Sequence, residues 1–282
     1  MSITIENALR DAARTLDRAG IESARKDARL LMRYVLKISL ETLLMDSGRE
    51  LTQEQQALFE ALVEKRAARR PMAQILGGRE FWGLPFKVNE HTLIPRPDSE
   101  TMISMLLAFT RRRAEKLRLL DLGTGTGCLL LSALSEYPQA TGLGVDISEE
   151  ALAVARENAV ALGLEKRVEF KKSDWNQEIN GVWDVILSNP PYIPTADLGG
   201  LSPDVALYEP RLALDGGGSG LDCYRAITGF LPAIMAEDGL ALLEVGAGQA
   251  AEVAALVTSS GLKVAQVACD LAGIERVIVI TK

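Results

Sequence analysis

Two short segments of the chain combine residue types that could do chemistry together. One is the glycine-rich run Asp121-Leu122-Gly123-Thr124-Gly125-Thr126-Gly127, which follows the strand-like Leu117–Leu120. The other is Asn189-Pro190-Pro191-Tyr192, which ends the apolar stretch 183–188. A glycine turn between a strand and a helix lets the backbone approach a ligand closely, and the tetrapeptide offers acceptors for a planar NH2 group. The pair predicts a reaction at such a nitrogen beside a nucleotide-like ligand.

Two acidic residues extend the predicted ligand site. Asp146 ends the next expected strand, where its carboxylate can accept hydrogen bonds from both hydroxyls of a ribose. Asp174 ends the following strand, where it can accept from an adenine amino group while Trp175 packs near the ring. The alternative is that both carboxylates only cap a helix or a turn. We favour the ligand site, because the carboxyl ends of successive strands in a parallel sheet lie at one edge.

The predicted lining is acidic. Asp121 places negative charge beside the glycines, and the phosphate-binding pattern Gly-x-x-x-x-Gly-Lys-Ser/Thr is absent. NAD would also satisfy Asp146, but S-adenosylmethionine carries adenosine and a sulfonium without any phosphate, so it suits this lining better. The proline-fixed segment Leu93–Asp98 could lie over the ligand. No metal is expected, because His91 is the only histidine and the three cysteines follow no ligand spacing.

The tetrapeptide answers a specific chemical problem. An amide or exocyclic amino nitrogen is a poor nucleophile, because its lone pair is delocalised into the adjoining π-system. The Asn189 side-chain carbonyl can accept one N–H and the Pro190 backbone carbonyl the other, which directs the lone pair toward a methyl donor. Pro191 has no competing N–H, and Tyr192 offers a ring face to a planar group. We therefore predict Asn189, Pro190, Pro191 and Tyr192 as catalytic and substrate-binding residues; the alternative is a plain turn after a buried strand.

Composition limits the class of protein. The chain has 282 residues, 48% of them hydrophobic, and a formal net charge of −7. No apolar stretch reaches the roughly 18 residues that a membrane span needs, and the N-terminus lacks a secretory pattern, so we expect a soluble protein that is not exported. The odd number of widely spaced cysteines suits a reducing compartment, so we expect a cytoplasmic protein, and we expect it to be a monomer. The acidic balance argues against nonspecific binding to nucleic acid. We interpret the basic runs Arg111–Arg113 and Lys65–Arg70 as solvated surface.

Three parts are expected along the chain. Residues 1–76 have apolar positions at helical spacing, which predicts a small all-α bundle. Residues 77–97 contain aromatic and β-prone residues around a turn, which predicts a β-hairpin linker. Residues 98–282 alternate strands with helices, which is typical of an α/β domain with a parallel sheet covered on both faces. The helical bundle carries no catalytic constellation, so packing support and partner docking both remain open for it.

With these motifs the sequence resembles the class I S-adenosylmethionine-dependent methyltransferases, and within them the HemK/PrmC family of protein N5-glutamine methyltransferases. The resemblance covers nearly the whole chain. Besides the two motifs, it rests on Arg70-Pro71, Ile75-Leu76-Gly77, Phe81-Trp82-Gly83, Leu93–Glu100, Glu209–Leu214, Asp215–Gly220 and Glu244-Val245-Gly246. Departures are small: Ser99 stands where the family often has Thr, and Asp215–Gly220 is a variable glycine loop.

This resemblance implies a Rossmann-like fold, with a mostly parallel seven-stranded sheet and an antiparallel C-terminal strand, preceded by a helical domain that helps to dock the substrate. It implies methylation of the glutamine in the Gly-Gly-Gln loop of peptide chain release factors, release of S-adenosylhomocysteine, and a role in translation termination. Carried over by motif, Gly123–Gly127, Asp146, Trp175 and Asn189 contact the cofactor. Asn189–Tyr192 hold the glutamine amide, and Arg96 and Pro97 border the same pocket.

Three alternatives stay open. A related enzyme could methylate a glutamine of a ribosomal protein, because the Ile-Pro-Arg-Pro segment is widely shared. An amino methyltransferase of RNA or DNA bases faces the same planar NH2 problem, although base flipping would call for a basic groove. A non-catalytic binding module could keep the cofactor pocket alone.

Overall fold

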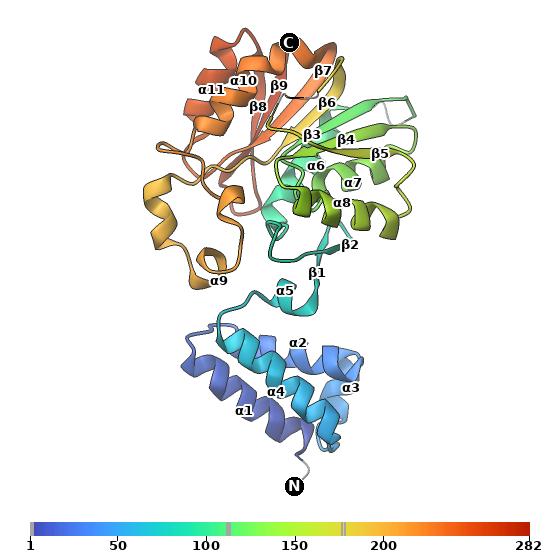
Figure 1. Ribbon diagram of the computed structural model, residues 1–282, viewed down its shortest axis with the longest axis vertical. Coiled ribbons are helices and arrows are strands. Elements are labelled where there is room, and N and C mark those ends of the chain that lie inside the picture. The colour runs from blue at the N-terminus through green and yellow to red at the C-terminus, as the bar shows by residue number, and fades with distance from the viewer. Residues whose placement is uncertain (1–2, 111–113, 176, 178) are drawn as a thin grey trace. The chain divides into compact units, whose positions relative to one another are not determined.

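The computed structural model describes residues 3–110, 114–175, 177 and 179–282, and the chain forms two compact units (Figure 1). One unit is the chain up to Gly77 together with Ser202–Tyr208; the other is Gly78–Leu201 with Glu209–Lys282. Ser202–Tyr208 lies within the stretch 98–282 that was expected to form one domain. The run Arg111–Arg113 lies outside the described residues. Within the described part, no helix has the length and apolar character that crossing a membrane requires.

The first unit is helical, as the spacing of its apolar residues predicts. Its elements are α1 (Ile5–Arg18), α2 (Ala24–Leu36), α3 (Leu40–Met45), α4 (Gln53–Ala67), α5 (Met72–Leu76) and the short α9 (Pro203–Ala206). Thr52 begins α4 with a capping box, in which its side chain accepts from the Gln55 N–H and the Gln55 side chain accepts from the Thr52 N–H. The core of the bundle contains Leu16, Leu31 and Phe59.

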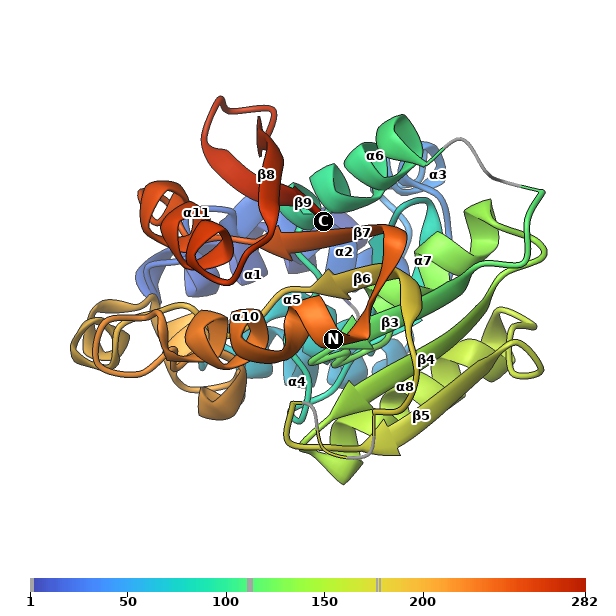
Figure 2. The same ribbon diagram turned by 90° about the horizontal axis from the view of Figure 1, so that it is seen from above.

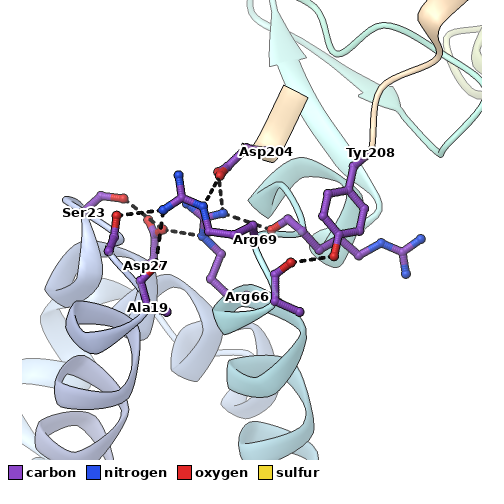
Figure 3. A network of polar contacts seen from close by, with 10 residues as sticks. Ala19, Ser23, Asp27, Arg66, Arg69, Asp204 and Tyr208 are labelled. Carbon is purple, nitrogen blue, oxygen red and sulfur yellow. Dashed lines mark hydrogen bonds and ion pairs between the residues drawn. The ribbon is translucent and has the colours of Figure 1, made fainter. Parts of the chain in front are cut away.

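The interpretation of Lys65–Arg70 as solvated surface is wrong for Arg66, which is only 7% exposed. Arg66 follows Phe59 and Leu62 at helical spacing, so it lies on the buried face of α4. Its Nε donates to Asp27 Oδ2 at 2.8 Å, and its Nη1 donates to Asp204 Oδ2 at 2.6 Å. Figure 3 shows the guanidinium groups of this network turned toward the two carboxylates. Two carboxylates therefore compensate the burial of this cation.

Further contacts join Ser202–Tyr208 to the helical unit. Arg69 Nε lies 2.7 Å from Asp204 Oδ1, an ion pair whose N–H direction does not meet hydrogen-bond geometry. The Tyr208 hydroxyl, labelled in Figure 3, donates to the Ala68 carbonyl at 2.6 Å. Gln74 Nε2 donates to the Tyr208 carbonyl at 2.8 Å. These contacts explain why a segment so distant in sequence belongs to the first unit.

The second unit contains a hairpin and a large sheet. The hairpin strands β1 (Gly78–Phe81) and β2 (Leu84–Lys87) pair antiparallel. The sheet strands are β3 (Arg118–Leu122), β4 (Thr141–Asp146), β5 (Val168–Lys172), β6 (Trp183–Ser188), β7 (Met235–Glu244), β8 (Lys263–Cys269) and β9 (Glu275–Thr281). The helices are α6 (Glu100–Phe109), α7 (Cys128–Glu136), α8 (Glu149–Ala161), α10 (Asp222–Ile234) and α11 (Ala250–Ser259); short 3-10 turns cover Pro97–Ser99, Thr195–Gly200 and Arg211–Ala213.

The strands follow the order β5-β4-β3-β6-β7-β9-β8, in which only β9 runs against its neighbours. This arrangement confirms the predicted mostly parallel seven-stranded sheet with an antiparallel C-terminal strand. The direction of strand order reverses between β3 and β6, and an open α/β sheet binds its ligands beside such a point.

Helices cover both faces of this sheet (Figures 1 and 2). Along β6, Val185 and Leu187 join the core beneath α6, α7 and α8, whereas Ile186 joins the core beneath α10 and α11. Successive side chains of a strand point to opposite faces, so a continuous apolar run is what a doubly covered strand requires. The sheet is therefore rigidly held where its carboxyl ends carry the predicted site.

Candidate active site

Strand register brings the main predicted residues to one edge of the sheet. Leu122 of β3 pairs with Val145 of β4 and with Ser188 of β6, and all three strands are parallel. The residues that follow these are Gly123, Asp146 and Asn189. Three predicted functional residues thus leave the sheet side by side at its carboxyl edge.

A pocket of about 320 Å³ opens at this edge. The predicted site residues that line it are Arg96, Gly123, Thr124, Gly125, Thr126, Asp146, Asp174, Trp175, Asn189 and Pro191. The predicted residues outside this lining are Pro97, Asp121, Gly127, Pro190 and Tyr192. The structure therefore gathers residues from the glycine loop, three strand ends and the proline-rich segment around one cavity.

The glycine loop needs its glycines for backbone geometry. Gly127 has a φ of 79° and stands immediately before α7, where a Cβ would lie 3.1 Å from Leu131 Cδ1 and 3.3 Å from Ala155 Cβ. Beneath the loop, a Cβ on Gly144 would lie 2.9 Å from the Thr124 hydroxyl. The left-handed φ of Gly127 costs little only for glycine. The loop can consequently pass close to a bound molecule.

Asp146 is fixed by backbone donors. Its Oδ2 accepts from the Gly125 N–H at 2.9 Å, and its Oδ1 accepts from the Ser148 N–H at 3.0 Å. Burial raises the pKa of this carboxyl group, and the backbone hydrogen bonds oppose that rise. A carboxylate has about four acceptor positions, so both oxygens can still accept from the hydroxyls of a ligand.

Asp121 is more deeply buried than Asp146 and Asp174, the other two acidic residues of the predicted site. It is 1% exposed, its Oδ2 accepts from the Thr124 hydroxyl at 2.6 Å, and its Oδ1 has no hydrogen-bond partner among the described residues. Burial raises the pKa of this carboxyl group to about 7. The direct contact of Asp121 with the glycine loop is thus through Thr124, which itself lines the pocket.

The end of β5 contributes a charged and an aromatic side chain. Asp174 is exposed, and Trp175 is half-buried with a φ of 53°. A left-handed backbone costs a non-glycine residue about 1–2 kcal/mol. Trp175 Cζ3 would lie 4.0 Å from a Cβ on Gly123, so its ring reaches the glycine loop. The strained residue turns an aromatic surface toward the same cavity that Asp146 borders.

The tetrapeptide after β6 is held from two sides. Asn189 Nδ2 donates to the Ser99 hydroxyl at 3.3 Å, and Ser99 is 3% exposed. Pro190 is buried, and Tyr192 packs against the core beneath α10 and α11. Gln249 Nε2 donates to the Tyr192 carbonyl at 2.9 Å. The tetrapeptide is thereby held through the Asn189 side chain and through the ring and carbonyl of Tyr192.

Glu209 was not predicted as a site residue, although it holds one rim of the pocket. Its side chain is 1% exposed, Oε2 accepts from the Ile94 N–H at 3.1 Å, and Oε1 accepts from Arg96 Nη2 at 2.7 Å. Arg96 and the neighbouring Pro95 line the pocket, as does Pro210. The sequence contained one indication of Glu209, the segment Glu209-Pro210-Arg211 in the family resemblance. Its contact with Arg96 was not predictable, because Arg96 lies 113 residues away in the sequence.

His91 and Cys128 also line the pocket. Burial raises the pKa of the Cys128 thiol to about 12, so it stays protonated at neutral pH. A nucleophilic cysteine reacts as the thiolate, and the buried position of Cys128 disfavours formation of the thiolate. The surroundings of Cys128 therefore do not favour a catalytic role for its thiol.

Comparison with known proteins adds to this geometry. The PrmC N-terminal domain matches residues 7–77, and the methyltransferase small domain matches residues 98–199. The release factor glutamine methyltransferase of Rhodospirillum rubrum is 45% identical over 258 residues, which are 92% of this chain and 79% of that protein. The one of Cereibacter sphaeroides is 45% identical over 272 residues, 96% of each chain.

Solved structures agree on the fold. A methyltransferase from Pyrococcus furiosus aligns with a TM-score of 0.52 at 17% identity, over 81% of this chain and 98% of that one. That likeness concerns the fold alone. The sequence relatives share far more than the fold, since they match almost end to end at 45% identity. The chain belongs to the family of release factor glutamine methyltransferases, which are S-adenosylmethionine-dependent enzymes.

Proposed function

We propose that this enzyme methylates N5 of the glutamine side chain in the Gly-Gly-Gln motif of peptide chain release factors, and so modulates translation termination. The observation that carries the proposal is the position of Asn189–Tyr192 directly after β6, at the sheet edge where Gly123 follows β3 and Asp146 ends β4. A planar amide held by Asn189 would lie beside whatever ligand the glycine loop binds. Every group involved comes from one chain, so the proposed reaction requires no second copy of the protein.

The pocket suits S-adenosylmethionine as the cofactor. The carboxylate of Asp146 retains acceptor positions for ribose hydroxyls, Asp174 supplies another acceptor, and Trp175 supplies an aromatic surface for adenine. Arg96 is the pocket's only Lys or Arg among the described residues, and Glu209 already neutralises it. An acidic lining of this kind attracts a cation and would repel a dinucleotide. When bound, S-adenosylmethionine supplies an electrophilic methyl group and leaves as S-adenosylhomocysteine.

Asn189 and Pro190 are proposed to orient the glutamine amide. Nδ2 of Asn189 is engaged by Ser99, which leaves Oδ1 as the end that can accept from the substrate NH2. The Pro190 carbonyl can accept the second N–H. With both N–H groups held in one plane, the nitrogen lone pair can face the methyl donor, and both acceptors stabilise the positive charge that develops on nitrogen.

The proposal requires no strong general base. One N–H proton of the methylated nitrogen is lost to water once the new N–C bond has formed. Pro191 brings no N–H that would compete for the amide oxygen or for the Asn189 carbonyl. Tyr192 contributes chiefly to the backbone position of the tetrapeptide, since its carbonyl is bonded by Gln249.

The test is transfer of labelled methyl from S-adenosylmethionine to an intact release factor, beside a release factor whose Gly-Gly-Gln glutamine is replaced by Ala. Label on the intact factor alone is the expected result. Absence of label on both, with cofactor binding retained, would refute the proposed substrate. A ribosomal protein and RNA are then the substrates to assay.

Asn189→Ala tests the proposed role of the tetrapeptide. Removal of an acceptor aimed at developing charge should cost roughly 2–4 kcal/mol of transition-state stabilisation, about a 30-fold to 900-fold loss of kcat. The Kd for S-adenosylmethionine, measured by calorimetry, should change little. A comparable loss of cofactor affinity would contradict this division of labour.

A further inference from the structure

A buried carboxyl group stands next to Asn189 and takes no part in the mechanism described above. Glu244 is the last residue of β7, and the parallel register pairs Ser188 of β6 with Leu243 of β7. Asn189 and Glu244 therefore follow at neighbouring strand ends. Glu244 is 2% exposed, and its Oε2 has no hydrogen-bond partner among the described residues. A buried carboxyl group with an unsatisfied oxygen costs stability, which calls for a compensating role.

Ser99 joins these two residues into one cluster. Its hydroxyl accepts from Asn189 Nδ2 at 3.3 Å. Burial raises the pKa of the Glu244 carboxyl group to about 7, and the polar side chains of Ser99 and Asn189 oppose that rise. Ser99 and Asn189 line the pocket, whereas Glu244 is outside its lining. The carboxyl group thus lies outside the pocket lining, at the strand end next to the one that carries the proposed substrate-binding amide.

The chemistry of the three groups selects one orientation of the amide. A side-chain amide has an accepting end and a donating end, and rotation by half a turn about its terminal torsion exchanges them. An ionised carboxylate can only accept, so it attracts the NH2 end and repels the oxygen. With NH2 toward Glu244 and Ser99, the Asn189 oxygen remains for the pocket. The opposite orientation would present an NH2 group to a substrate NH2 group and could not accept from it.

We infer that Glu244 and Ser99 are positioning residues, which hold the Asn189 amide with its oxygen available to the substrate. This inference rests on the proposed role of Asn189 and adds the groups that make that role possible. Protonation of Glu244 would weaken the selection, because a neutral carboxyl group can donate as well as accept.

The other groups around Glu244 set its charge in opposite directions. Ser99, Asn189 and the charge of Arg276 favour the ionised form of the Glu244 carboxyl group, whereas its burial and the charge of Asp98 oppose ionisation. The carboxyl group in turn acts on three uncharged neighbours, raising the pKa values of Cys128, Tyr192 and Tyr224. None of these three titrates below its ordinary range, so Glu244 is the group in this cluster expected to change charge near neutral pH.

The experiment compares Ser99→Ala, Ser99→Thr, Glu244→Gln and Asn189→Ala in methyl transfer to an intact release factor. Ser99→Ala and Glu244→Gln should each lower kcat by about tenfold to a hundredfold, less than the loss of the acceptor itself. The Kd for S-adenosylmethionine should stay within about twofold, since neither change removes a proposed cofactor contact. Ser99→Thr keeps the hydroxyl and should retain activity, which a purely structural loss at this position would not explain.

The pH profile supplies a second readout. In the parent enzyme, kcat should fall as the pH drops below about 7, where Glu244 gains its proton. The profile is measured at saturating S-adenosylmethionine, because Asp121, whose pKa also lies at about 7, contacts the glycine loop through Thr124. Glu244→Gln cannot titrate, so the acidic limb of kcat should disappear under these conditions. Persistence of the limb in Glu244→Gln would overturn the assignment to Glu244.

The outcomes separate this inference from the proposed function. Parent-like kcat in both Ser99→Ala and Glu244→Gln, together with a strong loss in Asn189→Ala, would overturn the positioning inference and leave the role of Asn189 intact. Parent-like kcat in Asn189→Ala would instead refute the proposed role of Asn189. If Glu244→Gln fails to fold, Ser99→Ala and Ser99→Thr still decide the inference, because both keep the buried carboxyl group in place.

Discussion

Replacement of Asp204 by Ala should release Ser202–Tyr208 from the helical unit. Asp204 Oδ2 accepts from Arg66 Nη1 at 2.6 Å, and Oδ1 lies 2.7 Å from Arg69 Nε. The side chain of Arg66 is 9% exposed and that of Asp204 22%, so water screens this pair only in part. The substitution removes the carboxylate and leaves both arginines in place.

The structure sets the size of the effect. Breaking a fully buried ion pair costs about 3–5 kcal/mol, because one charge is left without a partner. Arg66 keeps two acceptors, however: Asp27 Oδ2 at 2.8 Å from Nε and the Arg70 carbonyl at 3.1 Å from Nη1. The loss is then closer to one charge-assisted hydrogen bond, about 2 kcal/mol. The opening equilibrium of the segment should rise by about 30-fold.

Hydrogen exchange measures this opening directly. The N–H groups of Ala206 and Leu207 donate to the carbonyls of Ser202 and Pro203, and they should exchange about 30-fold faster in Asp204→Ala. The sheet strands of the second unit should exchange as before. Asp197→Ala is the matched control, since Asp197 is exposed and makes no ion pair within the described part of the chain.

Unchanged exchange in Asp204→Ala would refute the reasoning. It would mean that the hydrogen bonds of Tyr208 to Ala68 and Gln74 hold the segment without the ion pair. A segment opened equally by Asp197→Ala would also contradict it, because the effect would then follow from loss of charge alone.

Two further predictions concern the pocket. Asp146→Ala should raise the Kd for S-adenosylmethionine by about a hundredfold, because charge-assisted hydrogen bonds to the ribose are lost. Asp174→Ala should raise this Kd by clearly less, because Asp174 is exposed. Calorimetry measures both values, and equal effects would contradict the assignment of Asp146 to the ribose. Glu209→Ala should raise the same Kd about tenfold, and Glu209→Gln less, because the amide oxygen can still accept from the Ile94 N–H. Parent-like affinity in Glu209→Ala would show that the hydrogen bonds to Ile94 and Arg96 do not shape the pocket.

The arrangement of Gly123, Asp146 and Asn189 was predictable from sequence because each follows a short apolar strand. In a parallel sheet such positions must share one edge, so strand order and side-chain detail were not needed. The buried role of Arg66 could not be predicted in this way. Its run of basic neighbours is typical of a solvated helix end, and its partners lie 39 and 138 residues away in the sequence. Ion pairs over such separations leave no local pattern.

The same limit explains why Glu209 and Glu244 were missed as functional candidates. Each is a single carboxylate, and the residues around it do not by themselves indicate a chemical role. Its role depends on distant residues, which are Ile94 and Arg96 for Glu209 and Ser99 and Asn189 for Glu244. The spacing of strands in the sequence identifies residues at strand ends that can contact a ligand. Residues that hold those side chains in position can be identified only from tertiary contacts.

The segment after the tetrapeptide links two of these arrangements covalently. Ser202–Tyr208 is bound within the helical unit by Arg66, and the next residue, Glu209, holds Ile94 and Arg96 at the pocket of the other unit. No residue intervenes between the last anchored position and the first pocket-holding one. A displacement of Tyr208 therefore acts directly on the backbone of Glu209, because the two residues are consecutive.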